Sequence, residues 1–215
     1  MIAFAYCNTG PKREALYTAL AIGMVENIRA VMPDQEILMV TDDKTPPIKG
    51  INKILRIERN MPLMTWRLKC HQLAHSFGDE IVFTEPDVRF RSNIMDDFDR
   101  SVDIAVTTRE FDVFINNEKL NSPFTLGMTF SRSAEFWREA KLFCQTMSEE
   151  DQGWFGDMLS IAHVIGTEKF NVVQMDGSIY NHVVNDPHAD TDAKVLHYKG
   201  KRKSFLFPVA VEEAA

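Results

Sequence analysis

The chain has 215 residues, a formal net charge of −7, and 45% hydrophobic and 26% charged residues. This composition excludes a disordered or fibrous chain, and the length favours one well-buried core over two. The negative charge argues against a general nucleic-acid or anionic-membrane binder, because the field of the whole protein would repel either polyanion. We therefore expect one domain spanning residues 1–215 and no nucleic-acid partner.

The sequence has no stretch that approaches the roughly 18 to 20 apolar residues needed to span a bilayer. Its first ten residues lack both the basic leader and the long apolar run of a signal peptide. Cys7, Cys70 and Cys144 form no close-spaced pair, which favours buried free thiols in a reducing compartment over a redox or nucleophilic role. We expect a cytoplasmic protein without a transmembrane segment.

The first half of the chain alternates short apolar runs with stretches of helical periodicity. One such stretch carries Leu16, Leu20, Met24 and Ile28 at helical spacing and stops at Pro33, which cannot continue a helix. The predicted strands are residues 2–7, 36–40, 53–57 and 80–90, and the predicted helices are residues 12–32 and 63–77.

The second half continues the alternation, with an irregular stretch around residues 116–122 and a polar loop before the last strand. The predicted strands are residues 103–108, 124–130, 172–175 and 194–198, and the predicted helices are residues 132–147 and 151–165. Strands that alternate with helices imply an α/β fold with a mixed, mostly parallel sheet flanked by helices. Ligands of such folds bind beyond the carboxyl ends of the strands.

Two carboxylates, Glu85 and Asp87, lie at the end of the predicted strand 80–90, with Pro86 between them. Proline cannot donate a ladder hydrogen bond, so the chain must leave the sheet there. In an extended segment, residues two apart face the same way, so both carboxylates can converge on one divalent cation. In a solvated turn, the same pair would simply be exposed.

A second polar segment, residues 197–203, follows the apolar residues 195–196 near the C-terminus. It contains His197, Gly200, Lys203 and further basic residues. Neutral imidazole can ligate a metal, glycine lets backbone amides approach phosphate oxygens, and the cations offset negative charge, so the segment suits a diphosphate. The alternative is a solvated basic tail.

Together these two segments resemble the GT-A nucleotide-diphospho-sugar transferases, particularly the family 8 glycosyltransferases that include glycogenin and bacterial galactosyltransferases. Residues 84–88 are similar to the family's Asp-x-Asp motif, with Glu85 in place of the first aspartate. His197, Gly200 and Lys203 reproduce its late His-x-x-Gly-x-x-Lys motif. The resemblance implies a single GT-A, Rossmann-like domain.

Further matches follow in the family's order along nearly the whole chain. Arg67 resembles an arginine that contacts the donor, and Gly127 lies in a segment similar to one that lines the donor sugar. Asp151 and Gln152 are similar to a pair that faces the transferred sugar, and Asn181 follows a tyrosine as in the family. Asp151 has a second interpretation as a helix N-cap, which is compatible with the first.

The resemblance also places the nucleoside beside the loops that follow the first two strands. Asn8 and Thr9 follow the first of these strands, and Asp42 and Asp43 follow the second. The polarity of loops alone also accounts for these four residues. His71 and His75 lie four apart on a predicted helix, but no third ligand accompanies them, so we interpret them as structural.

The function implied by the resemblance is metal-dependent transfer of a sugar, with retention of configuration, from a nucleoside-diphosphate sugar, expected to be a UDP-sugar. Glu85, Asp87 and His197 would bind Mn²⁺ or Mg²⁺, and Asp151 and Gln152 would position the sugar. The mixed oxygen and nitrogen ligand set favours Mn²⁺. The acceptor, whether glycan, lipid or protein, is not identified by the sequence.

Two rival functions come from other classes of protein. One is a noncatalytic nucleotide-sugar binding or interaction protein on the same scaffold, which the divergent Glu85 favours. The other is a sugar nucleotidyltransferase, which shares related architecture. Such enzymes normally open with a glycine-rich, basic phosphate loop after the first strand, whereas residues 7–13 contain a single glycine.

Overall fold

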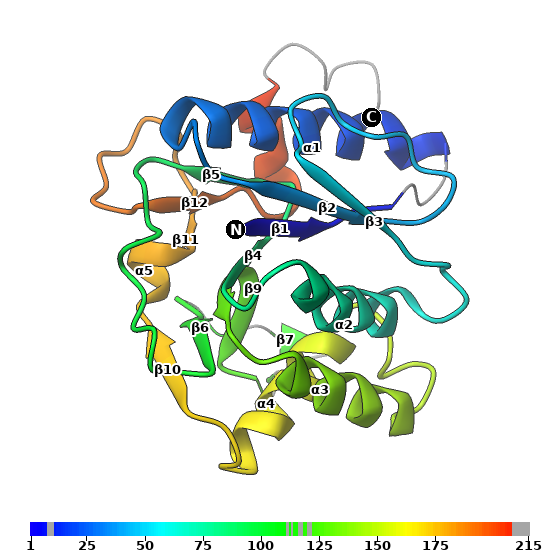
Figure 1. The fold of residues 1–215 in the computed structure, drawn as a ribbon. Helices are drawn as coiled ribbons and strands as arrows, with labels where there is room; N and C mark the ends of the chain where they lie inside the picture. Colours follow the sequence, from blue (N-terminus) through cyan, green and yellow to red (C-terminus); the bar gives the residue numbers. More distant parts are fainter. Residues whose placement is uncertain (8–10, 111, 113, 116–117, 120–121, 208–215) are drawn as a thin grey trace.

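The computed structural model describes residues 1–7, 11–110, 112, 114–115, 118–119 and 122–207, and Figure 1 shows the arrangement of its elements. The strands are β1 (Ile2–Ala5), β2 (Ile37–Thr41), β3 (Lys53–Arg56), β4 (Ile81–Thr84), β5 (Val88–Phe90), β6 (Ile104–Thr108), β7 (Phe114–Ile115), β8 (Glu118–Lys119), β9 (Phe124–Ser131), β10 (Val172–Met175), β11 (His182–Val183) and β12 (Val195–His197). The α-helices are α1 (Pro11–Val31), α2 (Leu63–Ala74), α3 (Ala134–Thr146), α4 (Gly156–Gly166) and α5 (Gly177–Tyr180), and the 3₁₀ helices are η1 (His75–Phe77) and η2 (Gly200–Leu206).

The central sheet has seven strands in the order β10-β6-β9-β4-β1-β2-β3. Strand β1 pairs in parallel with β2 and β4, β2 with β3, and β6 with β10, whereas β9 runs antiparallel to β4 and β6. The predicted α/β fold with a mixed, mostly parallel sheet is confirmed. The carboxyl ends of β1, β2 and β4 therefore meet at one edge, where ligands of such sheets bind.

Helices and a second, small sheet cover the two faces of the central sheet (Figure 1). On one face, Ile2 and Phe4 of β1 pack into a core with α1 and the small sheet. On the other face, Ala3 packs into a core with α2, α3 and α4. The central strands are apolar on both sides because side chains alternate across a sheet that is covered twice.

The predicted strand 80–90 is two strands in the structure, and this difference builds the site. Strand β4 ends at Thr84 in the central sheet, and β5 begins at Val88 in a three-stranded sheet of order β11-β12-β5. Between them the Val88 amide donates to the Glu85 carbonyl at 3.1 Å. Because Pro86 has no N–H, the ladder stops there, and the turn carries the chain from one sheet to the other.

The predicted helix 151–165 also begins later than expected, since α4 starts at Gly156. The N-cap position is held by Phe155, which provides no side-chain cap. The interpretation of Asp151 as an N-cap is therefore wrong. Its carboxylate instead accepts from the Ser148 hydroxyl at 2.7 Å, within the turns that precede the helix.

Two stretches that were expected to lack regular structure contain short elements. The first lies around residues 116–122, where β8 pairs antiparallel with the preceding strand β7. Residues 116, 117, 120 and 121 lie outside the described residues. The polar loop before the last strand contains α5 and β11. These elements are too short to give a periodic sequence pattern.

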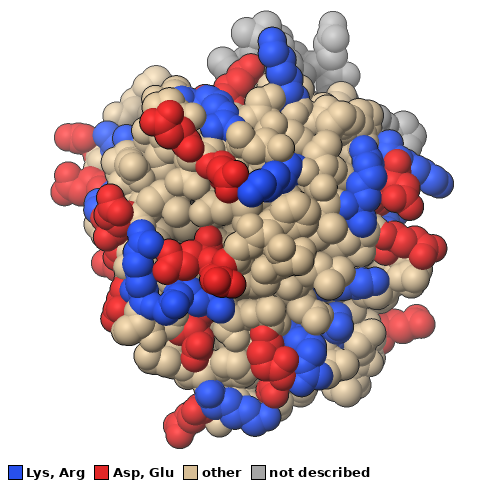
Figure 2. Space-filling model, in the orientation of Figure 1, with Lys and Arg blue, Asp and Glu red and all other residues tan. Residues whose placement is uncertain are grey.

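Within the described part of the chain, no helix is both long and apolar enough to cross a membrane. On the face drawn in Figure 2, basic and acidic side chains are interspersed and do not separate by sign. That face offers no broad basic surface of the kind that binds a polyanion.

Candidate metal centre

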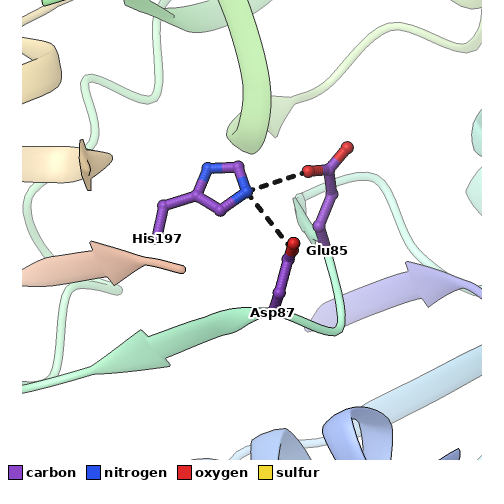
Figure 3. Close-up of side chains that lie close together, drawn as sticks. All are labelled: Glu85, Asp87 and His197. Carbon is purple, nitrogen blue, oxygen red and sulfur yellow. Dashed lines mark ion pairs between the residues drawn. The ribbon is translucent and has the colours of Figure 1, made fainter. Parts of the chain in front are cut away.

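Three potential metal ligands converge where the central sheet meets the small sheet (Figure 3). Glu85 follows β4, Asp87 precedes β5, and His197 ends β12. Strand β12 pairs antiparallel with β5, and the register sets His197 opposite Val88, the residue after Asp87. One ligand atom from each of the three residues lies within 4.8 Å of the others.

The imidazole of His197 faces both carboxylates. Its Nε2 lies 3.1 Å from Glu85 Oε2 and 3.2 Å from Asp87 Oδ1, yet it makes no hydrogen bond of good geometry, although the side chain is fully buried. Its Nδ1 lies 2.9 Å from Asn181 Oδ1. With Nδ1 donating to that oxygen, the Nε2 lone pair points at the carboxylate oxygens, and a cation between them removes the repulsion. The residues therefore fit a divalent ion with mixed oxygen and nitrogen ligands.

Gly127 on β9 gives this histidine its space. A Cβ at position 127 would lie 2.1 Å from Asn181 Oδ1 and 2.3 Å from His197 Nδ1. The Gly127 carbonyl also accepts from the Glu85 amide at 3.2 Å. Gly127 is thus required by the packing of the metal centre, whereas its predicted role in lining the sugar stays a prediction.

Arg67, on α2, joins the metal centre to α4. One guanidinium nitrogen pairs with Glu85 Oε1, and another pairs with Asp157 Oδ2. Asp157 is fully buried in the first turn of α4. Burial raises the pKa of Asp157, and the nearby Glu85 raises it further, while Arg67 opposes both.

The two carboxylates of the centre stay ionised because positive charge lies beside them: Arg67, Lys203 and, when no metal ion is bound, a proton on His197, whose pKa the two carboxylates raise against the effect of burial. Burial opposes the charge on Glu85, but Arg67 and His197 hold its pKa well below the usual range. Burial likewise opposes the charge on Asp87, and His197 with Lys203 lowers the pKa of Asp87. Two ionised carboxylates and one imidazole form a ligand set that suits a divalent cation.

Lys203 and Gly200 belong to η2, which follows β12. The Lys203 ammonium lies 2.5 Å from Asp87 Oδ2 and 5.8 Å from the centroid of the Tyr17 ring on α1. Gly200 has a φ of 58°, in the left-handed region, and starts η2. The segment is therefore packed against the centre and is not a solvated tail.

Gln152 and Asp151 lie apart from the three ligands. Gln152 Oε1 accepts from the hydroxyl of Thr65 at 3.2 Å, and Thr65 lies two residues before Arg67 on α2. The side-chain amide nitrogen of Gln152 donates to the Met147 carbonyl at 3.0 Å. Asp151 is exposed, and its carboxylate is hydrogen-bonded to Ser148. Their predicted contact with the sugar stays a prediction.

The residues expected at the nucleoside divide into two pairs. Asn8 and Thr9 lie outside the described residues. The Asp42 carboxylate accepts the amides of Lys44 and Thr45 at 3.1 and 2.8 Å, so it shapes its own turn, while Asp43 is exposed. The structure gives Asp42 and Asp43 no contact with the metal ligands.

The two helix histidines lie in an aromatic cluster. The His71 ring stacks on Phe83 with centroids 4.1 Å apart and meets Trp137 edge-on at 4.5 Å, and His75 Nε2 lies 2.9 Å from Ser131 Oγ. These contacts agree with the structural interpretation of both residues. The three cysteines are free and buried.

The structure is similar to a glycosyltransferase involved in the glycosylation of the major capsid of PBCV-1, with a TM-score of 0.63 and 13% identity over 94% of this chain and 95% of that one. The chain shares the glycosyltransferase fold. It also resembles the galactosyltransferase LgtC in complex with donor and acceptor sugar analogues, with a TM-score of 0.56 and 15% identity over 93% of this chain and 87% of LgtC. An active-site mutant of LgtC gives a TM-score of 0.57 at 14% identity. No protein-family model and no curated protein matches the sequence.

Two polar residues on this glycosyltransferase fold escaped the sequence analysis. Asp157 could have been found as an acid beside Gly156 at the start of an apolar helical run, had the helix start been predicted correctly. Lys199, whose ammonium donates to Thr125 Oγ1 at 2.7 Å, stood within a run of basic residues, and nothing in the run distinguished it.

Proposed function

We propose that this chain is a metal-dependent glycosyltransferase that moves a sugar from a nucleoside-diphosphate donor, expected to be a UDP-sugar, to an acceptor glycan, lipid or protein. The observation that carries the proposal is the convergence of Glu85, Asp87 and His197 at the carboxyl edge of the sheet. The glycosyltransferase fold supports it.

Glu85, Asp87 and His197 would hold Mn²⁺ or Mg²⁺, which supplies Lewis-acid stabilisation of the departing diphosphate. In the transfer, the bond between the anomeric carbon and the phosphate oxygen breaks, a bond to the acceptor oxygen forms, and the acceptor hydroxyl loses its proton to the departing diphosphate or to solvent. Negative charge accumulates on the diphosphate, and Lys203, which lies beside Asp87, would offset it. Arg67 fixes the Glu85 carboxylate. Retention of configuration and the contact of Asp151 and Gln152 with the sugar rest on the family resemblance.

The donor is tested by thermal unfolding in the presence of nucleoside diphosphates and their sugar esters, each with and without Mn²⁺. A ligand that binds only the folded state raises the unfolding temperature. We expect a rise for one base that requires both nucleotide and metal. The absence of any metal-dependent rise across the panel would contradict the proposal. If the protein bound the donor but neither transferred its sugar nor slowly hydrolysed it, the result would instead favour a noncatalytic nucleotide-sugar binding protein.

The ligand set is tested by the substitutions Asp87→Ala and His197→Ala. We expect both to abolish the Mn²⁺-dependent rise and to reduce transfer or donor hydrolysis at least a hundredfold, because each removes a ligand. His188→Ala is the matched control, since His188 is exposed in a loop. Circular dichroism checks the fold, and full activity of either ligand variant would refute the proposed coordination.

A further inference from the structure

A lysine and a threonine form a second polar contact beside the metal centre. Lys199 lies two residues after His197, and Thr125 lies two residues before Gly127. His197 approaches Gly127, and the Lys199 ammonium donates to Thr125 Oγ1 at 2.7 Å. The Lys199 backbone is extended, with φ −65° and ψ 143°. The Lys199–Thr125 pair therefore continues the line of the His197–Gly127 contact along β9.

Within the described residues, Lys199 has no carboxylate in an ion pair. The carboxylates nearest to it are occupied, because Glu85 pairs with Arg67 and His197, and Asp87 pairs with His197 and Lys203. The partly buried Lys199 ammonium has only the neutral Thr125 hydroxyl as its hydrogen-bond partner there. A cation withdrawn from water without an anion costs free energy, and a bound anion removes that cost.

A second cation, Arg109, also lacks a carboxylate partner among the described side chains. Arg109, at the end of β6, donates to the Ser122 carbonyl at 2.9 Å and contacts Met158 Sδ at 2.8 Å. Arg109 lies two residues after Thr107, which pairs with Thr125, the residue that accepts from Lys199. Arg109 and Lys199 therefore both lie toward β9.

The Lys203 ammonium pairs with Asp87 and lies near Tyr17 of α1, whereas Lys199 lies toward β9. In the proposed function, Lys203 and the metal ion would offset the charge of the diphosphate. An anion bound at Lys199 would then be a further group of the donor, and a single carboxylate would neutralise the Lys199 charge.

We propose that Lys199, held by Thr125, binds a carboxylate on the transferred sugar, so that the donor is a nucleotide ester of an acidic sugar such as a uronic acid. The inference rests on the proposed function. The other source of anionic oxygen is the diphosphate itself. The two are separable because only the carboxylate distinguishes a uronic acid from its neutral sugar.

The test is calorimetric titration of UDP, UDP-glucose and UDP-glucuronate into the protein with Mn²⁺. We expect the wild-type chain to bind UDP-glucuronate about tenfold or more tightly than UDP-glucose, as one charge-assisted hydrogen bond provides. Lys199→Met should remove that preference and leave the affinity for UDP unchanged. Lys201→Met is the matched control, because Lys201 is exposed on the same segment.

Thermal unfolding distinguishes binding from a structural role. Because Lys199 has no carboxylate partner among the described residues, Lys199→Met should unfold at the wild-type temperature or above it. Thr125→Val, which removes the hydroxyl that holds the ammonium, should weaken the preference in the same direction. If Lys199→Met lost affinity equally for all three ligands, Lys199 would be assigned to the diphosphate and the proposal would be overturned. Unchanged affinity for all three would overturn it too. If the wild-type chain bound none of the three ligands, the result would count against the proposed function as well.

Discussion

Gly127 shows how a residue without a side chain controls the chemistry of its neighbours. The imidazole of His197 and the amide of Asn181 occupy the volume that a Cβ would take. The hydrogen bond between them orients the histidine toward Glu85 and Asp87. The glycine in the sequence motif is thus explained by space, because its φ is not in the left-handed region.

Gly127→Ala should therefore disturb the metal centre. Both neighbours are buried, so the added methyl group must displace one of them, and overpacking of this kind costs about 1–3 kcal/mol. We expect a lower unfolding temperature and an Mn²⁺ affinity reduced at least tenfold, measured by calorimetry. Gly166→Ala is the control, because a Cβ there meets nothing within 4 Å. Wild-type Mn²⁺ binding by Gly127→Ala would contradict this account.

The spacing of residues predicted the site better than it predicted individual roles. The pairing of Glu85 and Asp87 with His197 came from the resemblance of both segments to family motifs, because the residues of each segment alone also allowed a solvated turn or a solvated basic tail. Asp157 was missed because the helix was predicted to begin at Asp151, five residues before α4 begins. Whether a charged residue near a helix start points inward depends on tertiary packing, which a single sequence does not encode locally.

At the scale of elements, the Arg67–Asp157 pair ties α2 to α4 beneath the metal centre. Asp157 is fully buried, and Arg67 holds Glu85 with its other nitrogen. A buried carboxylate that shares one guanidinium with a metal ligand couples the packing of the helices to the position of that ligand. Such a pair is costly to break, because the remaining charge stays buried.

Asp157→Asn tests this coupling. Loss of one partner of a buried ion pair destabilises by about 3–5 kcal/mol. We expect a loss of this order in urea unfolding, together with weaker Mn²⁺ binding as Arg67 is released from α4. Glu135→Gln is the control, because it breaks the exposed pair with Arg138 on α3 and should leave unfolding unchanged. Equal stability of the two variants would show that the Asp157 pair is not structural.

The order of most elements was predictable, whereas breaks within them were not. Apolar runs and helical periodicity located the seven strands of the central sheet and the helices α1 to α4. The sequence predicted that the chain leaves the sheet at Pro86, but it did not predict that residues 80–90 form two strands in two different sheets. That β5 joins β12 in a separate sheet depends on residues more than a hundred positions apart, and no local pattern reports it.

At the scale of the whole molecule, the face covered by α2, α3 and α4 buries His71 and half-buries His75, both in neutral form. Burial lowers the pKa of His71 well below its usual range and lowers that of His75 to about 4. An unfolded histidine titrates near 6.5, so below that pH the unfolded chain binds protons that the folded chain excludes. The folded state therefore loses stability as the pH falls from 6.5 toward 4.

This pH dependence can be assigned by His75→Gln. The wild-type chain should lose on the order of 1–2 kcal/mol more than the variant between pH 7 and pH 5, measured by urea unfolding at each pH. The comparison between the two chains cancels the titration of carboxylates that both retain. An identical loss in both would show that His75 is not the proton acceptor on unfolding.

The turn at Pro86 has a mechanical consequence for the molecule. Glu85 adjoins the large sheet, whereas Asp87 and His197 adjoin or belong to the small sheet, which also leads into η2 and Lys203. Glu85, Asp87 and His197 would therefore hold a divalent cation at the corner between the two sheets. Such an ion would fix the position of one sheet against the other, and with it the position of η2 and Lys203.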